Sequence, residues 1–293
     1  MSQMAHPGFL LPLDSYSSIK SAVADFFESG RRIGTYKGKL YGLTYVVGMR
    51  LVSYRKEYLA EVGKRADRAS LPKTWEQFRD VVRTLSRWEG GDLRRAGFDV
   101  PKSDEAFFLT TVRQQGKDAL NAGMTRAAFD GVEGERALQF AVDLLHRDGV
   151  DAFQRPAVPT GLEPLASQVM ASRWTNAQVL AGTRRAGLDP AQLVITDLTP
   201  EWTGKPAATG YLGGTWIAPS KQNKDVDATL DLLLFLGNYD HLTGVAEING
   251  SVPPLKPANS NWAPMKDPLV RPYFEAQERR GPFPAIPSGS RSV

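Results

Sequence analysis

Residues 35–54, TYKGKLYGLTYVVGMRLVSY, carry the clearest indication of the fold. The second half of this stretch is rich in β-branched and aromatic residues, and Gly42 and Gly48 interrupt it. Such side chains favour pleated strands, whereas a glycine inside a strand often marks a bulge or a bend. The pattern predicts two short strands with a sharp irregularity near Val47 and Gly48.

The first half of the stretch contains a glycine–lysine pair that invites comparison with a phosphate-binding loop. A Walker A loop needs four residues between its glycines and a Ser or Thr after the lysine, which supplies the magnesium ligand. Here three residues separate Gly34 from Gly38, and Leu40 follows Lys39. Both the spacing and the chemistry exclude the loop, and Lys39 is expected to be a solvated residue at a turn.

The segments on either side of this stretch predict helices that alternate with short strands. On the N-terminal side, Asp14 is expected to cap a helix that ends at Gly30. On the C-terminal side, Thr74 and Gln77 have the spacing of a capping box at the start of another helix. Further helices are expected over 132–149 and 226–239, and strands over 193–198 and 210–220. This alternation indicates an α/β sheet protein.

Composition sets limits on the class of protein. A chain of 293 residues is long enough for one large domain or two ordinary ones, and we expect two lobes. The 36 Lys and Arg residues are offset by 32 Asp and Glu residues that are scattered through the sequence. Because no block of one charge exists, a nucleic-acid partner is not expected.

Several kinds of site and segment are absent from the sequence. There is no cysteine, so disulfides, thiolate catalysis and cysteine-based zinc sites are excluded. The N-terminal residues lack the basic region and cleavage site of a signal peptide. The longest apolar run is much shorter than the roughly 20 residues that a membrane-spanning helix needs. We therefore expect a soluble chain without a signal peptide.

The sequence offers little support for catalysis, for a metal or for a cofactor. His6, His146 and His241 lie far apart and have no metal-binding spacing, and no G-x-S-x-G motif occurs. A glycan-acting enzyme remains an alternative, because it needs only two carboxylates that face each other about 5 to 10 Å apart. The candidates for such a pair are Asp104, Glu105, Asp197 and Glu201.

Two tryptophans stand out because small and polar residues surround them. Trp174 lies in MASRWTNAQ and Trp216 in LGGTWIAP, and a pocket position and a core position are equally compatible with each context. Trp75, which follows the capping Thr74, is expected in the core. Aromatic rings stack on the apolar faces of sugar rings, so the two tryptophans are candidates for a carbohydrate site.

An ordered series of segments resembles one known family. These segments are LLPLDSY, YKGKLYGLTYVVGMRLVSYRKEYLAEVG, LPKTWEQFRDVVRTLSR, GVEGERALQFAVDLL, SQVMASRWTNAQVL, GGTWIAPSKQNKDVDATLDLLLFL, AEINGSVPPLKPA and FPAIP. Together they resemble the extracellular solute-binding proteins of ABC importers, in the sugar-binding group that includes maltose-binding protein. No single segment is specific for this family, but the ordered set of segments over most of the chain is specific for it.

The resemblance implies a two-lobe periplasmic-binding-protein-like fold of type II. Two α/β lobes are then joined by crossing strands, with a cleft between the lobes that closes over the ligand by hinge motion. The expected organisation is 1–45 for part of lobe one, 46–194 for lobe two, 195–252 for lobe one and 253–293 for part of lobe two. Such a protein is not an enzyme and carries no cofactor.

The resemblance also implies which residues face the cleft. They lie at the crossing, at a helix start, at one tryptophan and at a glycine-rich step: Tyr45, Val47, Gly48, Glu105, Ala106, Trp174, Gly213, Gly214, Thr215 and Trp216. Arg50 is a weaker candidate, because strand alternation can point it outward. The expected partners are a small-molecule solute, with a sugar favoured, and the permease subunits of an ABC transporter. A monomer in the periplasm or at the cell surface is expected.

Departures from the family pattern keep other functions open. Thr44 replaces the usual proline, Gly48 stands where many relatives have a carboxylate, and Gly116-Lys117 replaces a Gly-Gly pair. Parts that relatives have at both ends are missing, so the resemblance implies an incomplete lobe one and a truncated chain. The alternatives are a binding protein for a polyol, glycerol phosphate, another anion or an oligopeptide, and a non-functional truncated paralogue.

Overall fold

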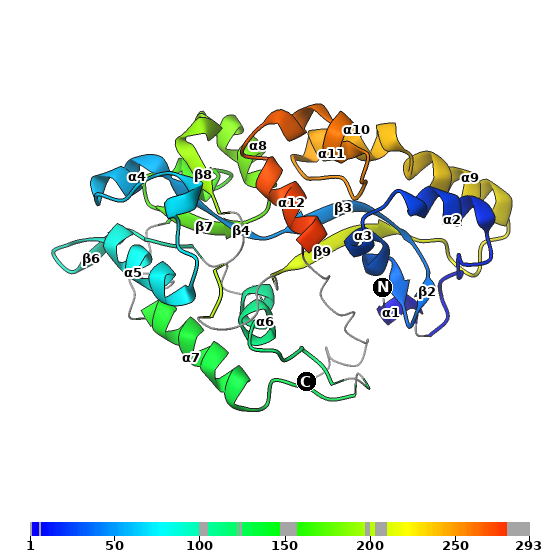
Figure 1. Cartoon of the computed structure of the whole chain (residues 1–293), viewed down its shortest axis with the longest axis horizontal. Helices are drawn as coiled ribbons and strands as arrows, with labels where there is room; N and C mark the ends of the chain where they lie inside the picture. Colours follow the sequence, from blue (N-terminus) through cyan, green and yellow to red (C-terminus); the bar gives the residue numbers. More distant parts are fainter. Residues whose placement is uncertain are drawn as a thin grey trace. The chain divides into compact units, whose positions relative to one another are not determined.

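The computed structural model describes residues 2–5, 7–99, 105–121, 123, 125–146, 157–196, 200–202 and 210–279. Its backbone contacts divide the chain into two units (Figure 1). Unit 1 consists of Met1–Met49, Leu120–Arg126 and Tyr211–Val293, and unit 2 of Arg50–Ala119 and Ala127–Gly210. The chain therefore passes between the units after Met49, on both sides of Leu120–Arg126 and before Tyr211. The first and the last of these crossings lie close to two of the glycine-containing segments predicted from the sequence.

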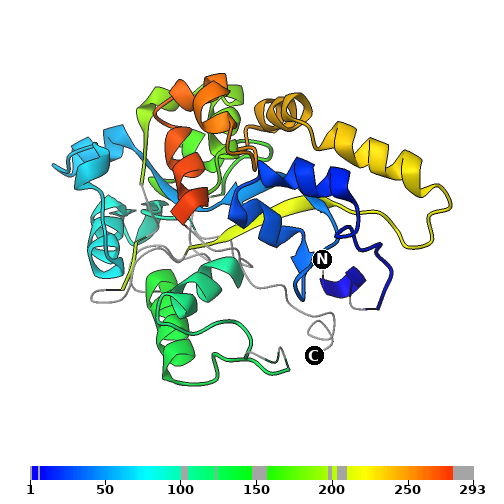
Figure 2. The ribbon, with the colours of Figure 1, turned by 45° about the vertical axis from the view of Figure 1, so that its right-hand side comes forward.

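Unit 1 combines short helices with two small antiparallel sheets (Figure 1, Figure 2). Its elements are α1 (Ser2–Ala5), α2 (Ser17–Ala24), α3 (Glu28–Ile33), β1 (Thr35–Tyr36), β2 (Lys39–Leu40), β3 (Leu43–Met49), β9 (Leu212–Ile217), α9 (Val226–Leu236), α10 (Tyr239–Asn249), α11 (Ala258–Asn261), the 3-10 helix η4 (Ala263–Lys266) and α12 (Arg271–Arg279).

The glycine–lysine pair lies in the hairpin between β1 and β2. Thr35 pairs with Leu40 and Tyr36 with Lys39, which leaves Lys37 and Gly38 as the two-residue loop. Their φ angles are 47° and 77°, and positive φ at both central residues is what a type I′ hairpin turn requires. The glycine thus serves the turn, and the side chain of Lys39 is exposed.

The larger sheet of unit 1 joins β3 to β9. A β-bulge interrupts the ladder, because Thr44 pairs with Trp216 and Val46 with Thr215, so Tyr45 is the extra residue. The predicted irregularity is confirmed, although the bulge lies slightly before Val47 and the two predicted strands, β3 and β4, are separated at Arg50.

Unit 2 contains a three-stranded antiparallel sheet with β4 in its centre, in the order β7-β4-β8. Its elements are β4 (Leu51–Arg55), α4 (Lys56–Glu61), the 3-10 helix η1 (Arg68–Ser70), α5 (Trp75–Leu85), β5 (Arg87–Glu89), β6 (Asp92–Arg95), α6 (Glu105–Arg113), α7 (Val132–His146), the 3-10 helix η2 (Pro164–Ala166), β7 (Ser172–Thr175), α8 (Gln178–Arg185), the 3-10 helix η3 (Pro190–Gln192) and β8 (Leu193–Ile195).

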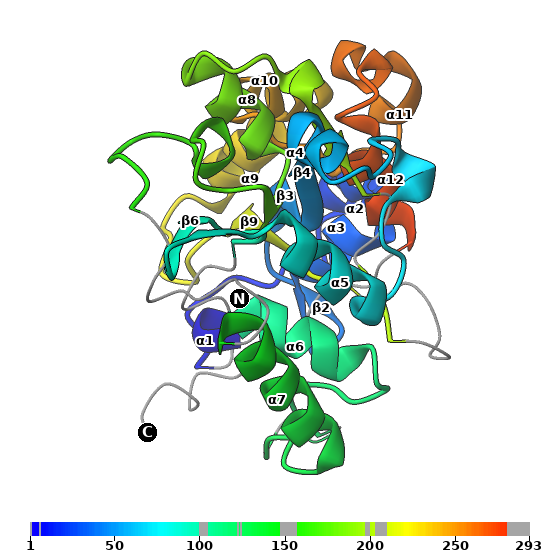
Figure 3. The same cartoon turned by 90° about the vertical axis from the view of Figure 1, so that its left-hand side faces the viewer.

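An aromatic cluster forms the core of unit 2. Trp75 has no exposed surface, and its ring lies 5.5 Å from that of Phe107 and 5.3 Å from that of Phe140. These residues come from α5, α6 and α7, and α6 packs against α7 (Figure 3). Edge-to-face and tilted ring pairs of this kind add to the burial of apolar surface. The expected core position of Trp75 is confirmed.

The local helix predictions had mixed outcomes. The capping box is confirmed, since the Thr74 side chain accepts from the Gln77 backbone and Gln77 reciprocates. The prediction for Asp14 was wrong, because its carboxylate instead accepts a hydrogen bond from the backbone N–H of Leu40, at 3.1 Å. The prediction for Gly30 was also wrong: α2 ends at Ala24, and Gly30 is buried inside α3.

The units differ from the expected lobes in four stretches: 46–49, 120–126 and 253–293 belong to unit 1 and not to lobe two, and 195–210 belongs to unit 2 and not to lobe one. The expected assignment placed 253–293 with lobe two, but Pro254 accepts a hydrogen bond from the backbone of Phe27, whose ring lies 5.2 Å from that of Phe274. The segment after residue 194 was expected in lobe one, but the Thr196 hydroxyl accepts from the backbone of Val52 in β4. Each segment belongs to the unit in which its sheet and ring contacts lie.

Candidate functional site

The expected ligand-facing residues fall into both units. Unit 1 contains Tyr45, Val47, Gly48, Gly213, Gly214, Thr215 and Trp216, and unit 2 contains Glu105, Ala106 and Trp174. In unit 1 the residues come together through the pairing of β3 with β9, two strands that are remote in sequence.

The two faces of the β3–β9 pair have different surroundings. Residues that pair directly in an antiparallel ladder point to the same side, and successive residues alternate. Val47 pairs with Gly214 and Met49 with Leu212, and α3 covers this side, where Ile33 lies against Gly214. Val47, Met49 and Leu212 are 0–2% exposed, whereas Gly214 is exposed although Ile33 lies on its side of the ladder. We call this the covered face.

The other side of the pair, which we call the open face, carries Val46, Gly48, Gly213 and Thr215. Val46 pairs with Thr215 and Gly48 with Gly213. Thr215 is exposed, and the other three are half-buried. Of the expected ligand-facing residues in unit 1, Gly48, Gly213 and Thr215 therefore share one accessible face, whereas the side chain of Val47 belongs to the core.

Two further expected residues of unit 1 lie away from this face. Trp216 packs against a small apolar cluster of Ala5, Leu10 and Tyr36. At Gly214 an added Cβ would overlap the carbonyl oxygen of Val46, so glycine is needed there for the close approach of the two strands.

The open face has bare backbone where its two glycines pair. An added Cβ at Gly48 would meet only the Gly213 carbonyl oxygen, at 3.8 Å, among the atoms that surround it. An added Cβ at Gly213 would overlap the phenol of Tyr211, with Cζ at 2.7 Å. Tyr211 therefore lies over Gly213 on the open face. Tyr211 was not among the residues predicted from the sequence, although its spacing of two from Gly213 in a strand was the available signal.

The expected residues of unit 2 are at the start of α6 and on β7. Glu105 is the first residue of α6 and is exposed, and Ala106 is 7% exposed. The next residue, Phe107, makes an edge-to-face contact of 5.1 Å with Trp174. Trp174 has no exposed surface, and its indole N–H has no hydrogen-bond acceptor among the described residues. Of the two interpretations of Trp174, the structure favours the core.

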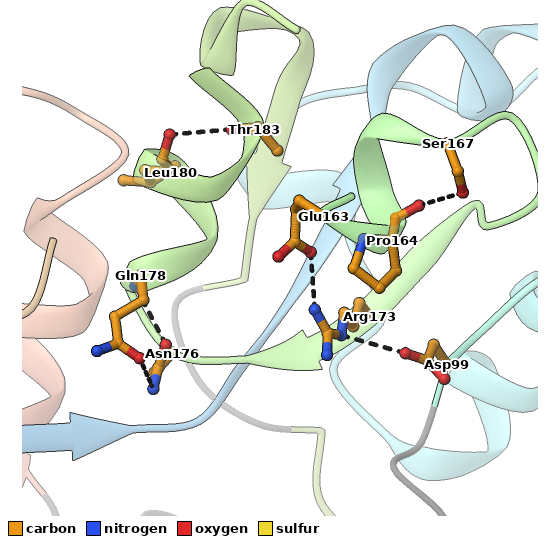
Figure 4. A network of polar contacts seen from close by, with 9 residues as sticks. All are labelled: Asp99, Glu163, Pro164, Ser167, Arg173, Asn176, Gln178, Leu180 and Thr183. Atoms are coloured by element: carbon orange, nitrogen blue, oxygen red, sulfur yellow. Dashed lines mark hydrogen bonds and ion pairs between the residues drawn. The ribbon is translucent and has the colours of Figure 1, made fainter. Parts of the chain in front are cut away.

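A buried ionic network holds β7 from the side opposite Trp174 (Figure 4). The Arg173 guanidinium lies 3.1 Å from the Asp99 carboxylate and 2.8 Å from that of Glu163. The Asp99 and Glu163 side chains are only 5% and 13% exposed, so the guanidinium compensates two carboxylates that have little access to water. The backbone N–H of Asp99 also donates to Ser172, which fixes β7 to this segment.

Unit 2 also contains a groove of about 550 Å³ that none of the expected residues lines. Its lining comes from α5, α7 and the segment of Trp202, and consists of Glu76, Arg79, Val132, Glu135, Arg136, Gln139, Phe140, Asp143 and Trp202. Within it Arg79 lies 3.7 Å from Asp143, Gln139 donates to Asp143, and the Arg136 guanidinium lies 4.3 Å from the Trp202 ring centre. Contacts among the lining residues thus account for much of its polar character.

The described residues were also searched for metal ligands and for the carboxylates of a glycan-acting enzyme. No group of three His, Cys, Asp or Glu residues there is placed to hold a metal ion. Of the carboxylates considered for glycan cleavage, Asp104 and Asp197 lie outside the described residues, and Glu201 binds through its backbone carbonyl to the N–H of Trp75. Burial raises the pKa of the Tyr54 hydroxyl in the core, which keeps that group protonated.

Solved structures of sugar-binding proteins are similar to the chain over almost its whole length. An ABC transporter solute-binding protein from Thermotoga lettingae, bound to alpha-D-tagatose, has a TM-score of 0.80 and 21% identity, over 98% of this chain and 72% of that one. The sugar-binding protein MalE from Xanthomonas citri has a TM-score of 0.79 and 22% identity, over 96% and 70%. The cyclic alpha-maltosyl-1,6-maltose binding protein of Arthrobacter globiformis has a TM-score of 0.74 and 23% identity, over 98% and 72%.

A comparison with family models points to the same class, whereas a comparison with curated proteins found no match. None of the described helices has the length and apolar character to cross a membrane. The family of bacterial extracellular solute-binding proteins matches residues 1–272. The chain therefore belongs to this family of binding proteins, which are not enzymes, and has the α/β fold of type II periplasmic binding proteins.

Proposed function

We propose that this protein is the solute-binding component of an ABC importer and that its solute is a neutral carbohydrate. Family membership supports the first part, and the sugars named for several structural neighbours support the second. The observation that carries the proposal is the open face of the β3–β9 pair, with its bare backbone at Gly48 and Gly213.

The chemistry of the open face suits a neutral solute. Its residues are Val46, Gly48, Tyr211, Gly213 and Thr215, and none of them carries a charge at neutral pH. A flat patch of backbone beside an aromatic ring accepts the apolar face of a sugar, while the Thr215 hydroxyl and backbone groups bond its hydroxyls. An anion such as glycerol phosphate needs a cationic or N–H-rich partner, so we favour a sugar over an anion.

The second unit completes the site in this proposal. The solute is held between two lobes, and the exposed Glu105 at the start of α6 contributes from the second lobe, where Trp174 and Ala106 support α6 and β7 from the core. The chain segments at Met49–Arg50 and Gly210–Tyr211 act as the hinge. Solute binding favours the closed form by its differential affinity, and a monomer in the periplasm or at the cell surface presents that form to the permease.

A ligand screen tests the proposal. Thermal unfolding is measured with a panel of mono- and oligosaccharides, polyols, glycerol phosphate and short peptides. A ligand that binds only the folded state, present at 100 times its Kd, stabilises it by about 2.7 kcal/mol, which raises the melting temperature by several degrees. Isothermal titration calorimetry then gives the affinity.

The outcomes separate the alternatives. A shift with a neutral sugar supports the proposal. A shift only with glycerol phosphate or with peptides replaces it with one of the other solutes. No shift with any member of the panel, in a sample that unfolds cooperatively, overturns it. Release of reducing ends from an oligosaccharide would instead revive the glycan-acting enzyme, which requires paired carboxylates.

A further inference from the structure

We infer that Tyr211 is a solute-contacting residue. Its ring lies over Gly213 on the open face, where the absence of a side chain leaves room for it. This inference rests on the proposed function and extends it to the class of solute. The ring is expected to stack on a cyclic sugar, a pyranose that presents contiguous axial C–H groups, in preference to an acyclic polyol.

The position of Tyr211 follows from the backbone at Gly213. The three atoms nearest to an added Cβ at Gly213 all belong to the Tyr211 side chain: the hydroxyl oxygen, Cζ and Cε1, the last two at 2.7 and 3.2 Å. Gly213 does not have a positive φ, so its backbone conformation does not require glycine. Glycine is needed at this position because a larger residue would occupy the space that the Tyr211 phenol fills.

The surroundings of the ring leave room for a ligand. Gly48 pairs with Gly213, and the nearest atom to an added Cβ at Gly48 lies 3.8 Å away. The ring therefore borders a patch of backbone without side chains. Tyr211 itself is half-buried, so part of its surface is accessible. It is also the first residue of unit 1 after the chain leaves unit 2 for the last time, next to the proposed hinge.

The chemistry of the ring selects among neutral solutes. An aromatic face attracts the polarised C–H groups of a sugar ring, and a rigid side chain with few rotatable bonds loses little entropy on binding. An acyclic polyol must lose internal rotations to present a comparable face, which weakens its binding. The hydroxyl of the phenol adds one polar contact that a phenylalanine lacks.

A cycle of variants tests the placement without any ligand. Gly213→Ala is expected to lower the melting temperature by about 3 °C, because the new methyl group displaces the ring. In a Tyr211→Ala background the same substitution is expected to shift it by less than about 1 °C, since the obstacle is gone. Equal losses in the two backgrounds overturn the placement.

Binding measurements test the contact. With a pyranose ligand found in the screen, calorimetry is expected to show a weakening of about tenfold or more for Tyr211→Ala and of less than about threefold for Tyr211→Phe. The matched control is Tyr239→Ala, a half-buried tyrosine at the start of α10, which is expected to leave the affinity unchanged. Tyr211→Ala is also expected to reduce the preference for the pyranose over a polyol of similar size.

The failure of this inference is distinguishable from that of the proposed function. If the wild-type protein binds no sugar, the proposed function fails, while the ligand-free cycle still reports on the ring position. If the wild type binds a sugar and Tyr211→Ala stays within twofold of it, the contact is overturned and the proposed function stands.

Discussion

The β3–β9 pair of unit 1 and the β4–β7 pair of unit 2 are both antiparallel and both carry residues that the sequence associates with ligand binding. They differ in what lies on the faces that carry these residues. On β3–β9, the face with Gly48 and Gly213 remains accessible. On β7, Trp174 has no exposed surface and packs on Phe107 from α6. A large aromatic residue thus became part of the core, whereas a pair of glycines forms the more accessible surface.

The sharpest test of this difference is Trp174→Ala. Removing a fully buried tryptophan leaves a cavity, so we expect a loss of about 3–5 kcal/mol in the free energy of unfolding, measured by urea denaturation. The control is Trp216→Ala, which removes a half-buried ring and should cost about 1–2 kcal/mol. A loss below about 1 kcal/mol for Trp174→Ala, together with loss of sugar binding, would return Trp174 to the binding surface.

The other side of β7 is tested by Arg173→Met. This change keeps much of the side-chain volume but leaves Asp99 and Glu163 without their cation, and we expect a loss of about 2–3 kcal/mol. Arg65→Met, which breaks an exposed ion pair with Asp67, is the control and should change stability by less than about 1 kcal/mol. Similar small effects for both variants would show that the network does not hold β7.

A pair of glycine variants compares the covered and open faces within one ladder. Gly214→Ala forces a methyl group against the Val46 carbonyl oxygen and Ile33, and we expect a loss of about 2 kcal/mol. Gly48→Ala meets no atom closer than 3.8 Å and should change stability by less than about 0.5 kcal/mol. Sugar binding should respond to Gly48→Ala, since the methyl group covers the bare backbone. Equal stability losses would contradict the distinction between the two faces.

The smallest expected effect concerns a local feature that does not depend on either face. Thr74→Ala removes the side-chain cap of α5, and we expect a loss of about 1 kcal/mol in denaturant unfolding, with sugar affinity unchanged. Thr74→Ser keeps the hydroxyl and should recover most of the stability. A large change in affinity would mean that α5 is coupled to the binding surface.

Features set by neighbouring residues were predictable from the sequence. The capping box at Thr74 and Gln77 and the helix α7 follow from spacings within one or two helical turns. The predicted strand with glycine irregularities was found, because β-branched and glycine patterns act within a few residues. The ordered family segments indicated the α/β fold, and the family match over residues 1–272 agrees with them.

Contacts between remote segments decided the rest. Asp14 accepts from Leu40 instead of capping a helix, and Trp174 became core because α6 packs on it. The accessible face emerges only when Gly48 pairs with Gly213, which also places Tyr211 beside it. The sequence alone determined the local elements and the family, because both depend on patterns along the chain. Which residues are buried and which can meet a solute depended on the partners that the tertiary structure supplied, since burial is a property of packed neighbours.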